Sequence, residues 1–391
     1  MAATGASESY RSFQDFKEIL MNNTAVEKFY TPGLHVNVTH REGVDEWFIS
    51  SAPLPGENPA LVFKRAAEAL KERGAQILNH FVWHKKEYKA LAYKTWESIL
   101  GETSWPVTWM IDPQGVSPFG GCTICAVSGT DVKYSLVDNR VVAAAYDTEM
   151  AEYVVLGDLR DEEITNSPAQ QIQCVFDQIY ECLQRYGMDF SHVMRTWFYN
   201  DRILDWYDEF NQARTAFFEK HDVFNKHVPA STGIGARNIH GSKLIASLIA
   251  AKAKDEQFSF YEVPSPLQNP ALNYGSSFAR ALEVATPDRR HVFISGTASI
   301  DEMGATVHPD NVSRQTEKTL DVVEAILKSR DMTWHNSLQG VAYIRKKEDA
   351  SIVRGVLAAR GLSDLPILLS NNVVCREDLL FELELQAARG V

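Results

Sequence analysis

The chain has 391 residues, more than the roughly 250–300 residues that one hydrophobic core supports, so we expect several structural units. With 45% hydrophobic and 23% charged residues, the composition is that of a folded protein and not of a disordered one. The net charge of -12, without any basic stripe, argues against a nucleic-acid partner. No apolar run reaches the roughly 18 residues that would predict a membrane-spanning segment.

The location of the protein is predicted from its first residues and its cysteines. The start, MAATGASESYRSFQ, lacks the basic and apolar regions of a secretory signal. Five cysteines, an odd and thinly spread number, are typical of reduced thiols. We therefore expect a cytoplasmic protein.

In chain order, residues 1–33 are expected to form an N-terminal extension, an added helix or tail. A first unit then covers residues 34–130 and predicts strand, helix, strand, helix and a closing pair of strands. Its elements are expected at residues 47–53, 60–77, 78–83 and 86–100, and then in PVTWMI and CTICAVSG.

The same order returns twice, in units at residues 134–253 and 272–391. Residues 170–199 align with 314–343 at a constant offset of 144 (314 minus 170), which pairs Tyr199 with Tyr343. A strand that ends near a glycine precedes each of these helices, in VVLGD and in VFISGT. The chain is therefore predicted to be a threefold internal repeat.

Each unit predicts an α+β layer, with two helices on one face of an antiparallel-rich sheet. The uncovered faces of three such sheets can be buried together around a pseudo-threefold axis, as in a homotrimer made from one chain. Three separate domains with polar outer faces are the alternative. The strands VVAAAY, VFISGTASI and LIASLIAA are apolar on both faces, which favours the single-chain pseudo-trimer.

The final strand, LLFELEL, carries the strongest chemical signal. Alternation places Glu382 and Glu384 on one face of it, with Leu380. Two carboxylates on a largely apolar strand are costly unless one is paired or protonated. A raised pKa would suit Glu382 as a general acid, and a structural carboxylate paired with an arginine is the alternative.

Several ordered motifs resemble one family. They are RTWFYNDRILDWYDEFNQARTAFF, PASTGIG, SFARA, FISGTAS, HPDNVSRQTEKTLDVV and CREDLLFELE, all within residues 195–384. Together they resemble the chorismatase branch of the RidA/YjgF superfamily. The resemblance is good over residues 134–391 and rests only on the pattern of elements in the first third.

The resemblance implies a cofactor-independent enzyme that removes the enolpyruvyl group of chorismate as pyruvate. Glu382 matches the family's proton donor. Cys375, together with Gly296, matches members that form 3-hydroxybenzoate; other members form a dihydroxycyclohexadiene carboxylate. The product would be a benzoate starter for secondary metabolism. The active chain is expected to be a monomer, as a pseudo-trimer, or a weak homo-oligomer.

Chorismate is a dianion, so its site needs cations, and arginine suits carboxylate capture. The candidate substrate-binding residues are Arg280, Arg214, Arg195, Arg237, Tyr199 and Tyr274. Arg280 and Arg214 are favoured because they lie inside the family-like motifs, although an arginine taken alone is more often part of an ion pair.

Some features depart from the pattern. Residues 262–276 form a shorter, neutral segment that keeps Tyr274 but lacks the arginines usual in chorismatases. A hydrolase or tautomerase acting on another small carboxylate, or a non-catalytic binding protein, are therefore alternatives. An imine deaminase is disfavoured, because no arginine follows Pro106-Val107, Pro229-Ala230 or Pro366-Ile367.

A metal site is not expected, although two pairs of residues have suitable spacings. Cys122 and Cys125 should point to opposite faces of a strand, so they cannot share an ion. His80 and His84 would share a face, but two ligands alone make a weak signal.

Overall fold

The computed structural model describes residues 26–41 and 43–391. Most of the expected N-terminal extension, residues 1–25, lies outside the described residues. The described end of that extension contains a β-strand, β1 (Val26–Thr31), which pairs with β2 (Leu34–Arg41).

The described chain forms three β-sheets, one in each third of the sequence. The first has the order β1-β2-β3-β6-β4-β5, with β3 (Val44–Ser51), β4 (Gln76–Trp83), β5 (Val107–Ile111) and β6 (Gly121–Ser128). The second has the order β11-β10-β13-β9-β8-β7, with β7 (Lys133–Val137), β8 (Arg140–Asp147), β9 (Ala151–Leu159), β10 (Val193–Asn200), β11 (Ala230–Gly235) and β13 (Leu244–Ala253). The third has the order β14-β15-β16-β19-β17-β18, with β14 (Ser259–Val263), β15 (Ala281–Ala285), β16 (Arg289–Ala298), β17 (Ser337–Ile344), β18 (Ile367–Ser370) and β19 (Phe381–Gly390).

All three sheets have one topology. The last strand of each unit lies between the third and fourth strands and runs antiparallel to both. The fourth and fifth strands run parallel in each case. The first sheet also gains a short strand from the second unit, β12 (Arg237–Asn238), which pairs with β5. The predicted threefold repeat is therefore present in the backbone.

Two helices accompany each sheet. They are α1 (Ala60–Arg73) and α2 (Lys89–Leu100), α3 (Pro168–Gln184) and α4 (Tyr207–Lys220), and α5 (Val312–Lys328) and α6 (Ala350–Ala359). Local sequence sets their ends. Ser167 and Gln170 form a capping box at the start of α3, with Pro168 at its first position. Gly74, in the left-handed conformation, ends α1.

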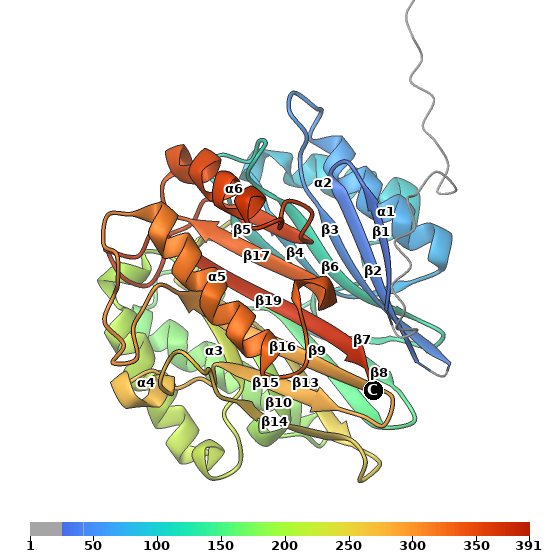
Figure 1. The fold of residues 1–391 in the computed structure, drawn as a ribbon. Coiled ribbons are helices and arrows are strands. Elements are labelled where there is room, and N and C mark those ends of the chain that lie inside the picture. The colour runs from blue at the N-terminus through green and yellow to red at the C-terminus, as the bar shows by residue number, and fades with distance from the viewer. Residues whose placement is uncertain (1–25, 42) are drawn as a thin grey trace, which may run out of the picture.

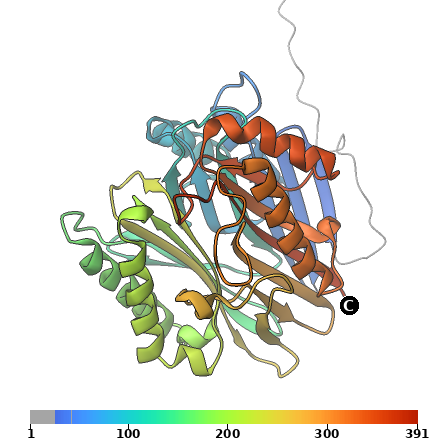
Figure 2. The same ribbon diagram turned by 60° about the vertical axis from the view of Figure 1, so that its left-hand side comes forward.

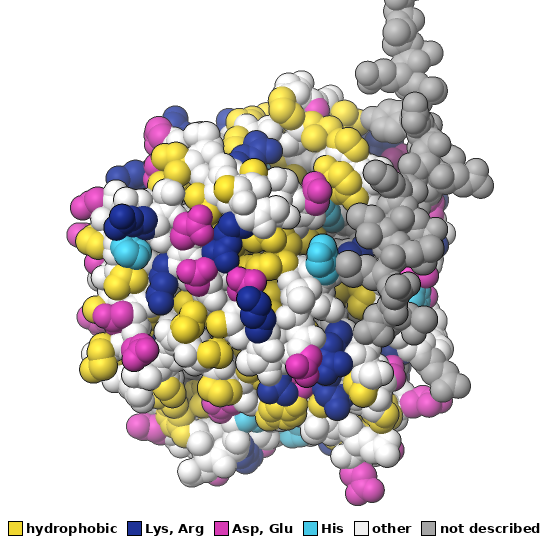
Figure 3. Space-filling view, in the orientation of Figure 1, with side chains coloured by type: hydrophobic (Ala, Val, Ile, Leu, Met, Phe, Trp, Pro, Cys, Tyr) yellow, Lys and Arg dark blue, Asp and Glu magenta, His cyan; other side chains and the backbone are white. Residues whose placement is uncertain are grey.

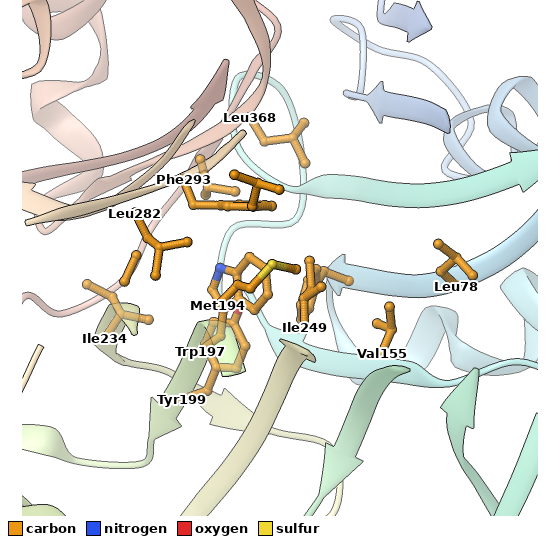
Figure 4. Packing of buried hydrophobic residues seen from close by; sticks show 14 of the residues in the cluster. Leu78, Val155, Met194, Trp197, Tyr199, Ile234, Ile249, Leu282, Phe293 and Leu368 are labelled. Atoms are coloured by element: carbon orange, nitrogen blue, oxygen red, sulfur yellow. The ribbon is translucent and has the colours of Figure 1, made fainter. Parts of the chain in front are cut away.

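The helices cover the outer faces of the sheets, and the inner faces meet at the centre of the molecule (Figures 1 and 2). Each helix pair packs on its own sheet in a separate cluster of buried hydrophobic residues. A further cluster joins all three units, with Leu78 from the first, Trp197 and Ile249 from the second, and Phe293 and Leu368 from the third (Figure 4). The α+β pseudo-trimer is therefore confirmed, and the strands apolar on both faces are the ones that line this shared core.

The division into units at residues 34–130, 134–253 and 272–391 stays a prediction. Two edge strands lie outside these limits, since β1 begins at Val26 and β14 at Ser259. Both are hairpin partners of strands that the repeat includes.

None of the helices within residues 26–41 and 43–391 is both long and apolar enough to cross a membrane. Basic and acidic side chains alternate on the face over α5 and α6 (Figure 3).

Candidate active site

A cleft of about 830 Å³ lies where the second unit meets the third. Its walls are α4 with the turn before it, residues 274–276, and residues 375–376. Four acidic side chains, Asp205, Asp208, Glu209 and Glu219, lie on the α4 side. Cys375 and Arg376 belong to the loop between β18 and β19, and this loop connects the cleft to Glu382.

Glu382 lies on β19, opposite Ala298 of β16 and Tyr343 of β17. Its side chain is buried, and burial raises the pKa of its carboxyl to about 8, with a further rise from the charge of Glu384 and an opposing effect of Arg195. The group therefore carries a proton at neutral pH. Protonated and shielded from water, it has the state that a general acid needs.

Glu384, two residues further on the same face, has hydrogen-bond partners from the second unit. It accepts hydrogen bonds from Arg195 Nη2 at 2.8 Å and from Trp197 Nε1 at 3.1 Å. Both donors come from β10 of the second unit, and the Arg195 guanidinium lies 4.6 Å from the centre of the Trp197 ring. Arg195 therefore forms an ion pair between units. Its guanidinium, which the sequence analysis considered for substrate binding, is already paired with Glu384.

Gly296 lies against Glu382. Its backbone N–H donates to Thr232 Oγ1 at 3.0 Å, which ties β16 to β11 of the second unit. A Cβ at this position would overlap Glu382 Oε1 and approach Thr232 Cγ2 to 3.3 Å. Only glycine therefore leaves room for the carboxyl in its present position.

Cys375 is half-buried and lines the cleft. Burial raises the pKa of its thiol to about 12, with a further contribution from the nearby charge of Glu382. The thiol is therefore neutral at physiological pH, which suits a residue that shapes a pocket better than one that attacks a substrate.

Arg214, on α4, is almost completely buried. Its Nη2 donates to Asn211 Oδ1 at 2.7 Å, and its guanidinium faces the rings of Phe210 and Phe278 at 5.2 and 5.8 Å. Burial lowers its pKa, while Tyr207 and Tyr274 favour the charged form. Arg214 Nε has no hydrogen-bond partner among the described residues. A buried cation with an unused donor is suited to binding a carboxylate.

Tyr274 lies between two guanidinium groups. Arg280 is 5.3 Å from the centre of its ring and Arg376 is 5.8 Å away. Arg280 donates from Nε and Nη2 to the backbone oxygen of Asn269, at 3.0 and 2.9 Å, so it holds the loop as well as the ring. Arg376 reaches the cleft wall and supplies a cation beside the neutral segment 262–276.

Of the expected binding residues, Tyr274 lines the cleft itself, and Arg214 and Arg280 lie next to Tyr274. Arg195 is paired with Glu384, and Tyr199 and Arg237 lie elsewhere. Tyr199 is fully buried in the core that joins the units, 5.9 Å from the ring of Phe81 (Figure 4). Arg237 lies on β12, and its exposed side chain is 4.0 Å from Asp201. Arg237 does not line the cleft, because β12 pairs with the first sheet, and a role for Arg237 in substrate binding stays a prediction.

Tyr207, Asn211, Thr232 and Arg376 were not selected from the sequence. All four lie within or directly beside the family-like motifs, but nothing in their spacing shows which side faces the cleft. Cys122 packs with the helices of the first unit and Cys125 with the opposite face of that sheet, as strand alternation predicts.

Comparison with known proteins adds to this geometry. Residues 135–250 match the family described as chorismatase FkbO/Hyg5-like, N-terminal. The chain is similar to the chorismatases. A chorismatase of Streptomyces hygroscopicus is 28% identical over 244 residues, which cover 55% of this chain and 67% of that protein. A 3-hydroxybenzoate synthase of the same species is 26% identical over 250 residues, covering 56% of this chain and 70% of that protein.

The similarity extends to the fold. A crystal structure of a chorismatase superposes with a TM-score of 0.61 at 20% identity, and the match covers 80% of this chain and 92% of the other. At this level of identity the superposition concerns the fold alone. It agrees with the chorismatase resemblance seen in the motifs.

Proposed function

We propose that the chain is a chorismatase-type enzyme that removes the enolpyruvyl group of chorismate as pyruvate, without a cofactor. The observation that carries the proposal is the protonated, buried Glu382 next to Cys375, which lines a cleft together with Arg376. The buried Arg214 also lies near Cys375. The similarity to chorismatases over more than half of the chain supports it.

In the proposed reaction, Glu382 donates its proton to the methylene carbon of the enolpyruvyl group. The adjacent carbon becomes an oxocarbenium-like centre, and the carboxylate left on Glu382 stabilises it electrostatically. Addition of water to this centre and cleavage of its bond to the ring oxygen release pyruvate and a dihydroxycyclohexadiene carboxylate. As water adds, one of its protons returns to Glu382. The second proton of the water passes to the departing ring oxygen when the C–O bond breaks, and pyruvate is left as the ketone.

Formation of 3-hydroxybenzoate needs no net water, because chorismate has the summed composition of 3-hydroxybenzoate and pyruvate. We favour this product. Gly296 faces the carboxyl of Glu382 and Cys375 lines the adjoining cleft, so both small residues are placed to shape the space for the ring. The match to a 3-hydroxybenzoate synthase supports the same choice.

We assign carboxylate binding to Arg214 first and to Arg280 and Arg376 second. Arg214 combines burial with an unused donor, whereas Arg280 already holds Asn269. Tyr274 orients both of the other guanidinium groups. Tyr199 is then a core residue that packs behind the site.

The test is incubation of the purified chain with chorismate, following pyruvate by a coupled assay and the aromatic product by chromatography. We expect pyruvate and 3-hydroxybenzoate in equal amounts. Pyruvate with the dihydroxycyclohexadiene product would keep the reaction and correct the product type. No consumption of chorismate would contradict the proposed substrate and favour another small carboxylate or a binding protein.

Substitution of Glu382 by glutamine removes the acid without changing its shape. We expect Glu382→Gln to lower kcat by about 10²–10⁴-fold. Glu377→Gln is a matched control, because Glu377 is an exposed carboxylate on the loop before β19. Unchanged turnover in Glu382→Gln would contradict the assignment of the acid.

A further inference from the structure

A second groove, of about 430 Å³, lies at a different boundary, where the third unit meets the first. It is lined by α6 and β18 of the third unit and by the ends of β1, β2 and β3 of the first. Hydrophobic side chains gather on the surface near α6 and the adjoining part of the first unit (Figure 3).

This groove occupies the position in the repeat that corresponds to the candidate active site. There, α4 of one unit faces the next unit, and β11 packs against β16. Here, α6 faces the next unit in the same way, and β18 packs against β3 and β6. The strand register shows which residue of the first unit is equivalent to Glu382. Tyr343 and Trp83 have equivalent positions in the fourth strands of their units. Glu382 pairs with Tyr343 and Gly121 pairs with Trp83, so Gly121 is the residue equivalent to Glu382.

The second groove therefore lacks the general acid. A Cβ on Gly121 would also collide with the backbone oxygen of Ser51, so glycine is the residue that fits at this position. A ligand in this groove can be bound but not protonated by the route proposed for the first. The inference that follows does not rest on the proposed function.

Most of the lining residues are hydrophobic, with Leu54, Leu357, Leu362 and Leu368 among them. Two polar features stand out. Ser50 is only 3% exposed, and its Oγ has no hydrogen-bond partner among the described residues. Arg354 is exposed on α6 and is the one permanently charged side chain among the described residues that line the groove. His35 is neutral, because burial lowers its pKa to about 4 against the opposing effect of Asp364.

We propose that this groove binds an aromatic monocarboxylate without converting it. One arginine at the rim suits one carboxylate, and leucine and proline walls suit a flat apolar ring. A ring hydroxyl gives the buried Ser50 hydroxyl the partner that it lacks in the free protein. A dianion such as chorismate would need a second cation, which the described lining does not offer.

The test uses isothermal titration of the full chain with benzoate and with 3-hydroxybenzoate. Ala358 is exposed and lines the groove, whereas its neighbour Ala359 is exposed and does not line it. We expect Ala358→Trp, which fills the groove, to weaken binding at least tenfold. Ala359→Trp is the matched control and should bind as the unmodified chain does.

Ser50→Ala separates the hydroxyl contact from the rest. This substitution should lower the affinity for 3-hydroxybenzoate by about three- to tenfold and leave the affinity for benzoate nearly unchanged. Arg354→Gln should lower the affinity for both ligands. The loss should be only about two- to fivefold, because the arginine is exposed to solvent. Thermal melting of each variant checks that the fold is kept.

Equal affinity in Ala358→Trp and the unmodified chain would overturn the proposal, because the ligand would then occupy another place, such as the cleft beside Cys375. Absence of binding by the unmodified chain at millimolar ligand would also overturn it. Neither result bears on pyruvate release from chorismate, so failure of this inference and failure of the proposed function are distinguishable.

Discussion

Glu382 and Glu384 share a face of one strand, yet Arg195 forms its ion pair with Glu384. Burial favours the protonated form of a carboxyl group, and it keeps Glu382 protonated, whereas Glu384 accepts hydrogen bonds from Arg195 and Trp197. Proton donation therefore depends on where a single guanidinium lies in the neighbouring unit.

The pH dependence of turnover follows from this. The pKa of Glu382 is about 8, so the proton-donating form dominates below that pH. We expect kcat/KM to be level on the acidic side of pH 8 and to fall about tenfold per pH unit above it. A pH–rate profile of chorismate consumption checks this, and a decline beginning near pH 5 would contradict a raised pKa.

The free energy of unfolding should also decrease as the pH rises, because of the same carboxyl group. The folded protein keeps this proton up to about pH 8, whereas an unfolded glutamate releases it near pH 4. The contribution of Glu382 is therefore fully present at low pH and is lost as the pH rises toward 8, by about 1.4 kcal/mol per pH unit. In urea denaturation at pH 5 and pH 7, the unmodified chain should lose stability relative to Glu382→Gln. A constant difference between the two would contradict the prediction.

Gly296 allows a direct test of the packing around the acid. Gly296→Ala places a methyl group on Glu382 Oε1, and the buried strand leaves little room for relaxation. We expect at least a tenfold loss of kcat and a lower melting temperature. Gly355→Ala, in α6 with open space around it, is the control and should keep full activity. Full activity in Gly296→Ala would show that the carboxyl can move away.

At the level of elements, β10 supports β19 from the neighbouring unit. Arg195→Met leaves the buried carboxylate of Glu384 without its ion partner, which we expect to cost about 3–5 kcal/mol in urea denaturation. The double variant with Glu384→Gln should recover part of that loss. Arg202→Met removes an exposed ion pair with Asp205 and should cost about 1 kcal/mol or less.

The comparison of sequence and structure is also clearest at this level. Alternation placed Glu382 and Glu384 on one face because a strand has a strict period of two. The helices were found within a few residues, since their apolar faces and caps are local features. The position of Arg237 could not be predicted in this way, because β12 leaves its own unit to pair with β5, and no local pattern indicates such a long-range pairing.

The contacts of the remaining site residues could not be predicted from the sequence for a different reason. Arg376 directly follows Cys375 in the sequence, but its approach to Tyr274 depends on how two distant loops meet. Arg195 was a reasonable candidate for binding a substrate, and its ion pair with Glu384 requires knowledge of the neighbouring sheet. The sequence was enough to propose Glu382 as the acid, whereas tertiary contacts decide which cations are available to a ligand.

On the scale of the whole molecule, the shared core predicts that the three units unfold together. Five of the eight tryptophans, at positions 47, 83, 96, 105 and 109, lie in the first third of the chain. Tryptophan fluorescence therefore reports mainly on the first unit, whereas far-UV circular dichroism reports on all three. The two urea transitions should coincide. Separate midpoints would show that the first unit unfolds on its own.

The three sheets share one strand order, but they are encoded once each, in a single chain. In a ring of three identical subunits, every mutation appears three times, so a change that improves one interface alters all three interfaces. Here Gly121 and Glu382 occupy matching positions, and each boundary has been free to change alone. Three units in one chain allow one boundary to specialise in chemistry while the other boundaries take on different functions.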